Sequence, residues 1–236
     1  GEFSQLETKN MVSDISVNDI SIRSYSDIGD VLVNEESVLV SESSTGAKTL
    51  SIRGARQEEM VYMYDGVKMH NGGRRSLDLS MFDVGGLETV EVLRGSHENA
   101  SGSSGTINFV PQLSYGNGVN FYQRFGTYNT GSYHTGVSLG NSLISLEYGT
   151  GQSVSRQFYE SAENADISRK SENQFISAGY RPNTNTEVKL YQIKSGRIYN
   201  NHYNADSIGS RLLVNTIKIE RKSDTYGQLE LYISNQ

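Results

Sequence analysis

The chain has 236 residues, and its 21 Lys and Arg against 27 Asp and Glu leave a net charge of −6. This acidic balance argues against nucleic acid as a partner. The absence of cysteine excludes disulfides, thiolate metal sites and cysteine nucleophiles. A mean hydropathy of −0.51, with no apolar run near about 18 residues, excludes helical membrane spans within these residues. It does not exclude a transmembrane β-barrel, whose alternating strands dilute their own hydropathy.

Up to Pro111 the chain consists of short apolar runs separated by loops rich in Gly and Ser. Each run has the length of a strand and is rich in β-branched or aromatic residues, so it predicts a strand. With the helices described next, this half is predicted to be a compact α+β domain. The predicted strands are Val38–Val40, Met60–Tyr64, Thr89–Leu93 and Thr106–Val110.

One helix is predicted over Ser26–Val33. Ser26 is of a type that caps helix N-termini, and apolar residues follow it at spacings of three and four on one face. A second, shorter helix is predicted over Leu77–Phe82. Asp65–Gly66 is a turn pair, because glycine permits a positive φ.

After Pro111 the pattern changes to longer segments in which apolar and polar residues alternate. Short turn signals and two longer polar stretches, Gln152–Lys170 and Gly196–Ser207, separate the segments. Turns on one side and long loops on the other are typical of an outer-membrane barrel, but the alternation alone fits a soluble antiparallel domain equally well. The segments are Val119–Phe125, Tyr133–Leu139, Ile144–Tyr148, Gln174–Tyr180, Glu187–Ile193, Leu213–Ile219 and Leu229–Ile233, with short turns at Gly140–Ser142, Arg181–Asn185 and Lys222–Asp224.

Five strings in the first half, in order and at about the right spacing, together resemble the plug domain of TonB-dependent outer-membrane transporters. The resemblance covers residues 12–111 by motif and residues 112–236 by layout. Asp14–Val17 and Asp27–Leu32 occupy the places of the family's first strand and first helix. The five strings are Leu50–Gly54, Val61–Val67, Leu77–Ser80, Leu87–Gly95 and Gly102–Val110.

The chain departs from the family pattern at several points. Ser96 follows Gly95 where the family usually has Pro, Gly102 lacks a preceding Tyr, and Thr106 replaces a Gly. The family's energy-coupling segment, the Ton box, lies upstream of the plug, and Leu6–Val12 matches it poorly. Either this segment is trimmed, or coupling uses another one.

The resemblance implies an α+β plug domain followed by antiparallel transmembrane strands of a barrel that has 22 strands when complete. Residues 1–11 would be a remnant of the coupling region, 12–111 the plug and 112–236 the N-terminal portion of the barrel. Seven or eight strands do not close around a plug of this size. We therefore expect that the chain is truncated or that a second polypeptide completes the barrel.

The resemblance also assigns roles to residues of the plug. Arg53 and Arg94 would lock plug to barrel by pairing with glutamates of the inner wall, a role that suits a bidentate guanidinium. The apical loops would be 41–48, 67–76 and 96–101. They contain the candidate ligand-binding residues, which are Lys68, His70, Asn71, Arg74, Arg75 and His97.

A loop this rich in cations and donors suits an anionic ligand such as a ferric siderophore or a corrinoid, although a solvated loop would look the same. His70 and His97 lack the spaced partners of a metal site. The sequence contains no HExxH, Walker or GxSxG motif in a fitting context, so no enzyme is expected.

The implied function is import of a scarce, bulky nutrient across the bacterial outer membrane, energised through TonB. Expected partners are a small-molecule or metal-chelate ligand, TonB, outer-membrane lipid and, in a split barrel, a second chain. No intrinsic cofactor is expected, and iron or cobalt would enter as cargo. The alternative is a non-transporting β-rich surface binding or assembly module that reuses a plug-like domain.

Overall fold

The chain divides into two units, Gly1–Gln112 and Leu113–Gln236, and each is described by itself. The computed structural model describes residues 12–16, 27–35, 37–43, 45–52, 56, 59–69, 77–82, 84–93, 105–127, 130–159, 165–201, 206–223 and 227–235.

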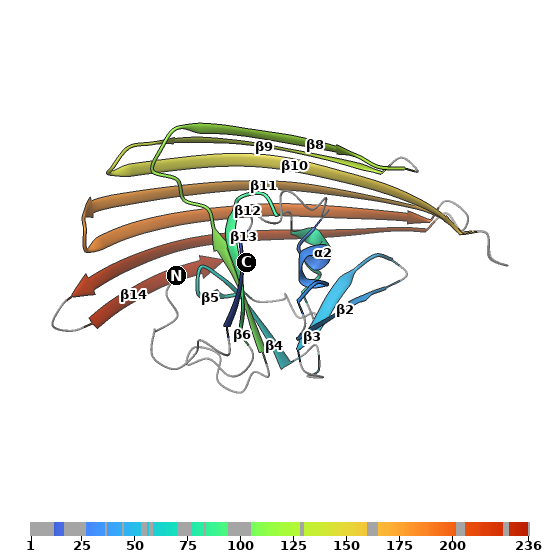
Figure 1. Cartoon of the computed structure of the whole chain (residues 1–236), viewed down its shortest axis with the longest axis horizontal. Coiled ribbons are helices and arrows are strands. Elements are labelled where there is room, and N and C mark those ends of the chain that lie inside the picture. The colour runs from blue at the N-terminus through green and yellow to red at the C-terminus, as the bar shows by residue number, and fades with distance from the viewer. Residues whose placement is uncertain are drawn as a thin grey trace. The chain divides into compact units, whose positions relative to one another are not determined.

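A five-stranded sheet forms the centre of the first unit (Figure 1), in the order β1-β6-β7-β4-β5. The pair β4 and β7 is parallel, and the other neighbours are antiparallel. A separate hairpin of β2 and β3, a short helix α2 and a 3₁₀ turn η2 complete the unit. The bounds are β1 Val12–Ser16, α2 Ile28–Leu32, β2 Val38–Glu42, β3 Lys48–Ile52, β4 Met60–Tyr64, β5 Val67–Lys68, η2 Leu79–Met81, β6 Leu87–Leu93 and β7 Gly105–Pro111.

Strand β7 lies at the core of this unit, between β6 and β4, and all seven of its residues are buried. Its Ile107 and Phe109 have no exposed surface, and the Phe109 ring stacks on that of Phe82 with 5.2 Å between centroids. A two-residue turn joins β4 to β5. Both Asp65 (φ 49°) and Gly66 (φ 78°) have positive φ there, as this kind of tight hairpin turn requires.

The four predicted strands of the first unit are confirmed, with small differences at their ends. The predicted helix is also confirmed, but it begins at Ile28, and its cap is Asp27 rather than Ser26. The Asp27 Oδ1 atom accepts a hydrogen bond from the Asp30 backbone N–H at 3.1 Å. The second predicted helix is the single turn η2, capped by Asp78.

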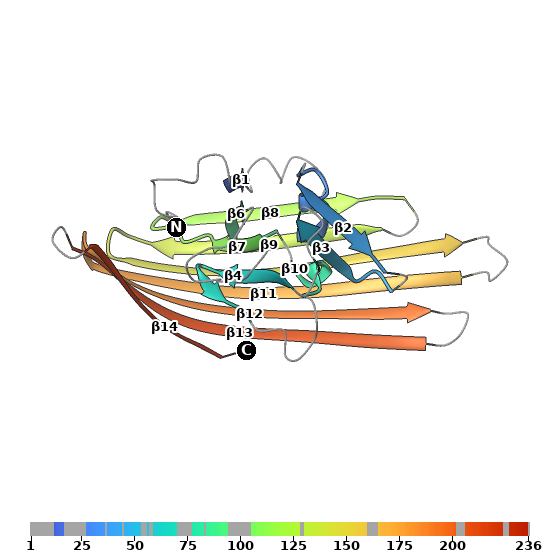
Figure 2. The same ribbon diagram turned by 90° about the horizontal axis from the view of Figure 1, so that it is seen from below.

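The second unit is one seven-stranded antiparallel sheet in which every strand pairs with its neighbours in sequence, from β8 to β14. Figure 1 shows it running from green to red, and Figure 2 shows the strands side by side from below. All seven predicted segments are strands. Their bounds are β8 Gly118–Phe125, β9 Gly131–Gly140, β10 Ile144–Tyr159, β11 Ala165–Asn183, β12 Thr186–Asn201, β13 Asp206–Ser223 and β14 Gly227–Asn235.

The prediction of long loops over Gln152–Lys170 and Gly196–Ser207 is wrong. Strand β10 continues to pair with β11 up to Tyr159 and Ala165, and β12 with β13 up to Asn201 and Asp206. The sequence pattern did not detect these strand ends, because they are mainly polar. Alternating hydropathy indicates that one face of a strand is apolar, but it does not indicate backbone pairing. A bidentate pair from Arg156 to Asp166, at 2.9 and 2.6 Å, joins β10 to β11 in one of these polar parts.

The predicted turns at Gly140–Ser142 and Arg181–Asn185 are confirmed. At the third position, Lys222 and Ser223 belong to β13, and Asp224 lies outside the described residues. Asn141 Oδ1 accepts the backbone N–H groups of Leu143 and Ile144 at 2.8 and 3.0 Å, which fixes the turn between β9 and β10. The register shifts between Tyr180 and Asn183, and this irregularity accommodates Pro182, which has no N–H to donate.

One face of this sheet, here the apolar face, carries exposed apolar side chains. Cross-strand partners share a face, so the register places them in rows. None of the helices among the described residues is long and apolar enough to cross a membrane. The exposed apolar residues are Val119, Phe121, Val137, Leu139, Ile144, Leu146, Tyr148, Tyr180, Leu190, Ile217, Ile219, Leu229, Leu231 and Ile233.

Candidate functional site

Most of the residues predicted to bind ligand or to lock the plug lie outside the described residues. Lys68 is described, and it is an exposed residue of β5 that pairs with Met63. The expected loop 41–48 is narrower than predicted, since its ends belong to β2 and β3. The residues outside the described ranges are Arg53, His70, Asn71, Arg74, Arg75, Arg94 and His97.

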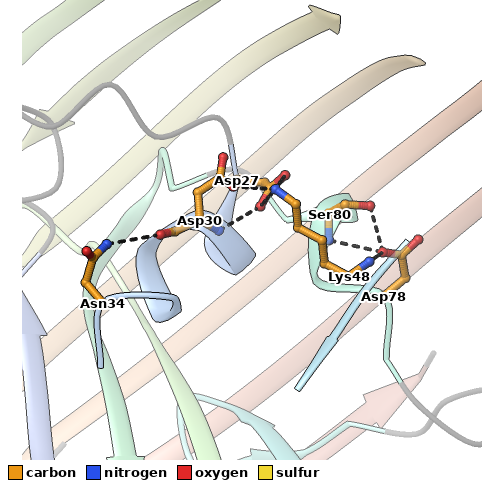
Figure 3. A network of polar contacts seen from close by, with 6 residues as sticks. All are labelled: Asp27, Asp30, Asn34, Lys48, Asp78 and Ser80. Atoms are coloured by element: carbon orange, nitrogen blue, oxygen red, sulfur yellow. Dashed lines mark hydrogen bonds and ion pairs between the residues drawn. The ribbon is translucent and has the colours of Figure 1, made fainter. Parts of the chain in front are cut away.

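A polar cluster centred on Lys48 joins three elements of the first unit (Figure 3). The Lys48 ammonium group, at the start of β3, lies 2.8 and 3.0 Å from the two carboxylate oxygens of Asp27 and also contacts Asp30. Asp27 is the N-cap of α2 and Asp30 lies in its first turn. The lysine therefore ties the hairpin to the beginning of the helix.

The backbone of Lys48 makes a second attachment. Its N–H donates to Asp78 Oδ1 at 3.0 Å, and the same oxygen accepts from the Ser80 N–H at 3.1 Å and the Ser80 hydroxyl at 2.6 Å. Asp78 thus caps η2 while it holds β3. One residue of the hairpin positions both helical turns.

Close packing accompanies this cluster. A Cβ atom on Gly29 would come within 2.5 Å of Lys48 Cδ, so a larger residue there would displace the lysine stem. Only 12% of the Lys48 side chain and 13% of that of Asp27 is exposed. The ion pair is therefore largely withdrawn from water.

Burial raises the pKa of Asp27 to about 6, although the positive charge of Lys48 opposes this shift. Burial alone would lower the pKa of Lys48, but Asp27 and Asp30 outweigh it and raise that pKa. At neutral pH the cluster therefore holds one cation between two carboxylates. Below about pH 6, Asp27 takes up a proton.

A second buried network fixes the base of the turn between β4 and β5. The side-chain amide of Asn108 in β7 makes both contacts. Its Nδ2 donates to Glu91 Oε2 at 2.7 Å, and its Oδ1 accepts a hydrogen bond from the Gly66 N–H at 2.9 Å. Burial raises the pKa of Glu91, and the hydrogen bond from Asn108 opposes the shift. The predicted ligand loop begins at Val67, so this network holds the strand from which the loop departs.

The face of the second unit opposite the apolar one, here the polar face, has its own ordered features. Tyr122, His134 and Phe175 stack in sequence, with ring centroids 4.9 and 5.9 Å apart. Gly149 makes room for this stack, because a Cβ atom there would lie 2.2 Å from the Phe175 ring. Three strands thus share one aromatic stack.

A ladder of alternating charges crosses β11, β12 and β13 on the polar face. Arg181 contacts Glu187 at 2.9 Å and Lys218 contacts Glu220 at 2.6 Å. Lys189 bridges the two parts, 3.0 Å from Glu220 and 3.8 Å from Glu187. Because each charge faces an opposite one, the ladder bonds neighbouring strands through side chains as well as backbone.

The cross-element contacts of Lys48 carried no sequence signal, because its acidic partners lie 18 and 21 residues earlier in the chain. Asn108 had a signal, since it interrupts an apolar run that forms a buried strand. A buried amide in such a run requires hydrogen-bond partners.

Comparison with known families identifies the first unit. Residues 4–107 match the family model described as the TonB-dependent receptor plug domain. This part of the chain is a TonB-dependent receptor plug domain. The resemblance seen in the sequence is confirmed, and a search of curated proteins finds no match.

Solved structures show that the fold extends past the plug domain. The copper transporter OprC superposes with a TM-score of 0.76 at 16% identity over 95% of this chain and 37% of its own. The siderophore receptor PirA from Acinetobacter baumannii gives 0.73 at 18% identity, over 95% and 39%. A mutant of the ferric enterobactin receptor PfeA from Pseudomonas aeruginosa gives 0.72 at 16%, over 95% and 40%.

The chain spans about two fifths of the length of these proteins, 37% to 40%. At identities below 20% the likeness establishes fold. The predicted fold class, a plug domain followed by antiparallel strands of a partial barrel, is confirmed.

Proposed function

We propose that this chain belongs to an outer-membrane receptor that imports a scarce, bulky nutrient with energy supplied through TonB. The observation that carries the proposal is the succession of a plug domain and a long-stranded antiparallel sheet with one exposed apolar face. An apolar face that is exposed across all seven strands is unfavourable in water and suits contact with lipid.

For the ligand we propose an anionic metal chelate of the ferric-siderophore class. PirA is described as a siderophore receptor, and PfeA has been solved in complex with enterobactin. In this chain the support is the segment 67–76, whose Lys68, Arg74 and Arg75 supply positive charge next to donors such as Asn71. Iron enters as cargo of the chelate, and a corrinoid is the alternative cargo.

We further propose that Arg53 and Arg94 hold the plug domain by pairing with carboxylates of the surrounding wall. Arg53 follows directly on β3 and Arg94 on β6. A guanidinium placed away from bulk water requires a carboxylate partner, and bidentate pairing supplies a hold that is strong yet reversible.

The test is uptake of radiolabelled iron by cells that produce the native protein containing this chain, offered with a panel of iron chelates. Replacing Arg74 and Arg75 together by alanine should lower uptake at low chelate concentration, and Lys222→Ala, an exposed cation of β13, serves as the matched control. Wild-type uptake that does not depend on TonB would contradict the proposal.

The alternative surface module makes a different prediction. Such a protein would stay monodisperse without detergent and would show no TonB-dependent uptake of any chelate. Monodispersity without detergent and TonB-dependent uptake are measured independently, so the transport hypothesis and the surface-module hypothesis can each be rejected separately.

A further inference from the structure

The apolar face of the seven-stranded sheet contains a hollow of about 550 Å³ across β11, β12 and β13. Two neighbouring rows of the register supply six of its nine lining residues, and Arg197, Ser207 and Ser210 are the others. The first row is Glu172, Gly196 and Arg211, and the second is Lys170, Ile198 and Gly209.

Glycine forms the floor of this hollow in both rows. A Cβ atom on Gly209 would meet no atom within 4 Å, and one on Gly196 would lie 3.9 Å from the nearest atom, the Ser210 carbonyl oxygen. Side chains would fit at both positions, so the space is open because glycine occupies them and not because the backbone requires glycine.

Basic side chains border the hollow on opposite strands. Lys170 rises from β11 and Arg211 from β13, while Lys194 of β12 lies one row nearer the apolar residues. Lys170 pairs with Glu172 at 2.6 Å, but 45% of the Lys170 side chain and 63% of the Glu172 side chain are exposed. Such an exposed pair contributes little stability and exchanges partners easily. The surroundings therefore favour an anion.

The hollow lies at a defined height on the face. Leu190 of β12 belongs to the apolar row that contains Ile217 and Ile233. Gly196 lies six residues further along the same strand and on the same face, which is about 20 Å along the strand. For a strand tilted by about 40° this becomes about 15 Å along the membrane normal, so the hollow lies toward one border of the apolar rows.

We propose that this hollow binds the phosphate group of a membrane lipid, with the lipid chains lying over the apolar rows of β11, β12 and β13. The inference rests on the proposed function only in requiring that the apolar face contacts lipid. Arg211 and Lys170 donate to the phosphate oxygens from either side, and Ile198 contacts the first carbons of the chains.

The test uses the full chain in nanodiscs of phosphatidylcholine that contain a minor fraction of phosphatidic acid, with retained lipids counted by native mass spectrometry. We expect selective retention of phosphatidic acid. Arg211→Gln should weaken this retention about tenfold, the effect of losing one or two hydrogen bonds to a charged group. Gly209→Leu, which fills the hollow and leaves every charge in place, should weaken it as well.

Arg221→Gln is the matched control. Arg221 lies on the same face of β13, beyond Ile219 at the other end of the apolar rows. Equal losses for Arg211→Gln and Arg221→Gln would overturn the proposal, because any exposed cation at the border of the apolar rows would then suffice. Inorganic phosphate that displaces the lipid at low concentration would also overturn it, since the site would then be one for free phosphate.

The outcomes separate this inference from the proposed function. A chain that enters nanodiscs but retains phosphatidic acid no better than phosphatidylcholine contradicts the hollow alone. A chain that stays outside the nanodiscs contradicts lipid contact, and with it the transport proposal.

Discussion

The plug domain buries its central strand on all sides, whereas the sheet of residues 113–236 leaves one whole face exposed. In the plug domain β7 is buried throughout, and side-chain networks around Lys48 and Asn108 fix the turns. In the sheet, backbone pairing and a charge ladder join neighbouring strands, and one face carries a set of exposed apolar side chains. The comparison teaches that two β-sheet regions of one chain are stabilised differently: core packing stabilises the plug domain, and strand pairing stabilises the sheet of residues 113–236.

The largest effect is expected from the plug core. Phe109→Ala removes a ring that has no exposed surface and stacks on Phe82, so it should lower the free energy of unfolding by about 3–5 kcal/mol. Denaturant titration of the full chain in detergent measures this change. Ile217→Ala, on the exposed apolar face, is the matched truncation and should have little effect. Equal losses would mean that the two regions do not differ as described.

The next effect concerns the cation between two aspartates. Lys48→Met leaves Asp27 and Asp30 facing each other in a largely buried site, so it should cost about 2–3 kcal/mol at pH 7. The loss should shrink toward pH 5 as Asp27 takes up a proton. An equal loss at both pH values would show that the lysine acts through packing alone.

Asp27 itself should make the plug domain sensitive to pH. Its pKa in the folded state is raised from 3.8 to about 6, so its contribution to stability is fully present below about pH 3.8 and is lost as the pH rises through about 6. Asp27→Asn keeps a capping side chain but removes the titration. The stability of the wild type relative to this variant should rise by up to about 3 kcal/mol between pH 7 and pH 4. A constant difference in denaturant titrations over this range would refute the shift.

Asn108→Ala should cost about 1–3 kcal/mol, because it removes the donor to buried Glu91 and the acceptor of the Gly66 N–H. Amide hydrogen exchange should show faster exchange at Gly66 than in the wild type. Protection at Gly66 that is unchanged would mean that the turn holds without Asn108.

The smallest effect is expected at the polar end of the sheet. Arg156→Gln breaks the bidentate pair with Asp166, but backbone pairing of β10 and β11 continues past it to Tyr159. The denaturant midpoint should not change measurably. A clear shift would show that side chains, not strand pairing, hold this part together.

Sequence patterns located nearly every described element because apolar residues mark the strands. They failed at Gln152–Lys170 and Gly196–Ser207, where apolar residues are too sparse to alternate regularly and backbone pairing reveals the strands. The Asp65–Gly66 turn was predictable from its residue types. The Lys48 cluster was not, because its partners come together only through the tertiary fold. The roles of the predicted lock and ligand residues, including Lys68, stay predictions.

The central claim is that the apolar face of the seven-stranded sheet contacts lipid. The chain contains no tryptophan, so a single introduced indole reports from one place. Leu190→Trp lies on the apolar face and Tyr191→Trp on the opposite one, one residue apart in β12. In vesicles containing brominated lipid, fluorescence at position 190 should be strongly quenched and that at position 191 should not. Equal quenching at both positions, or none at either, would contradict the account.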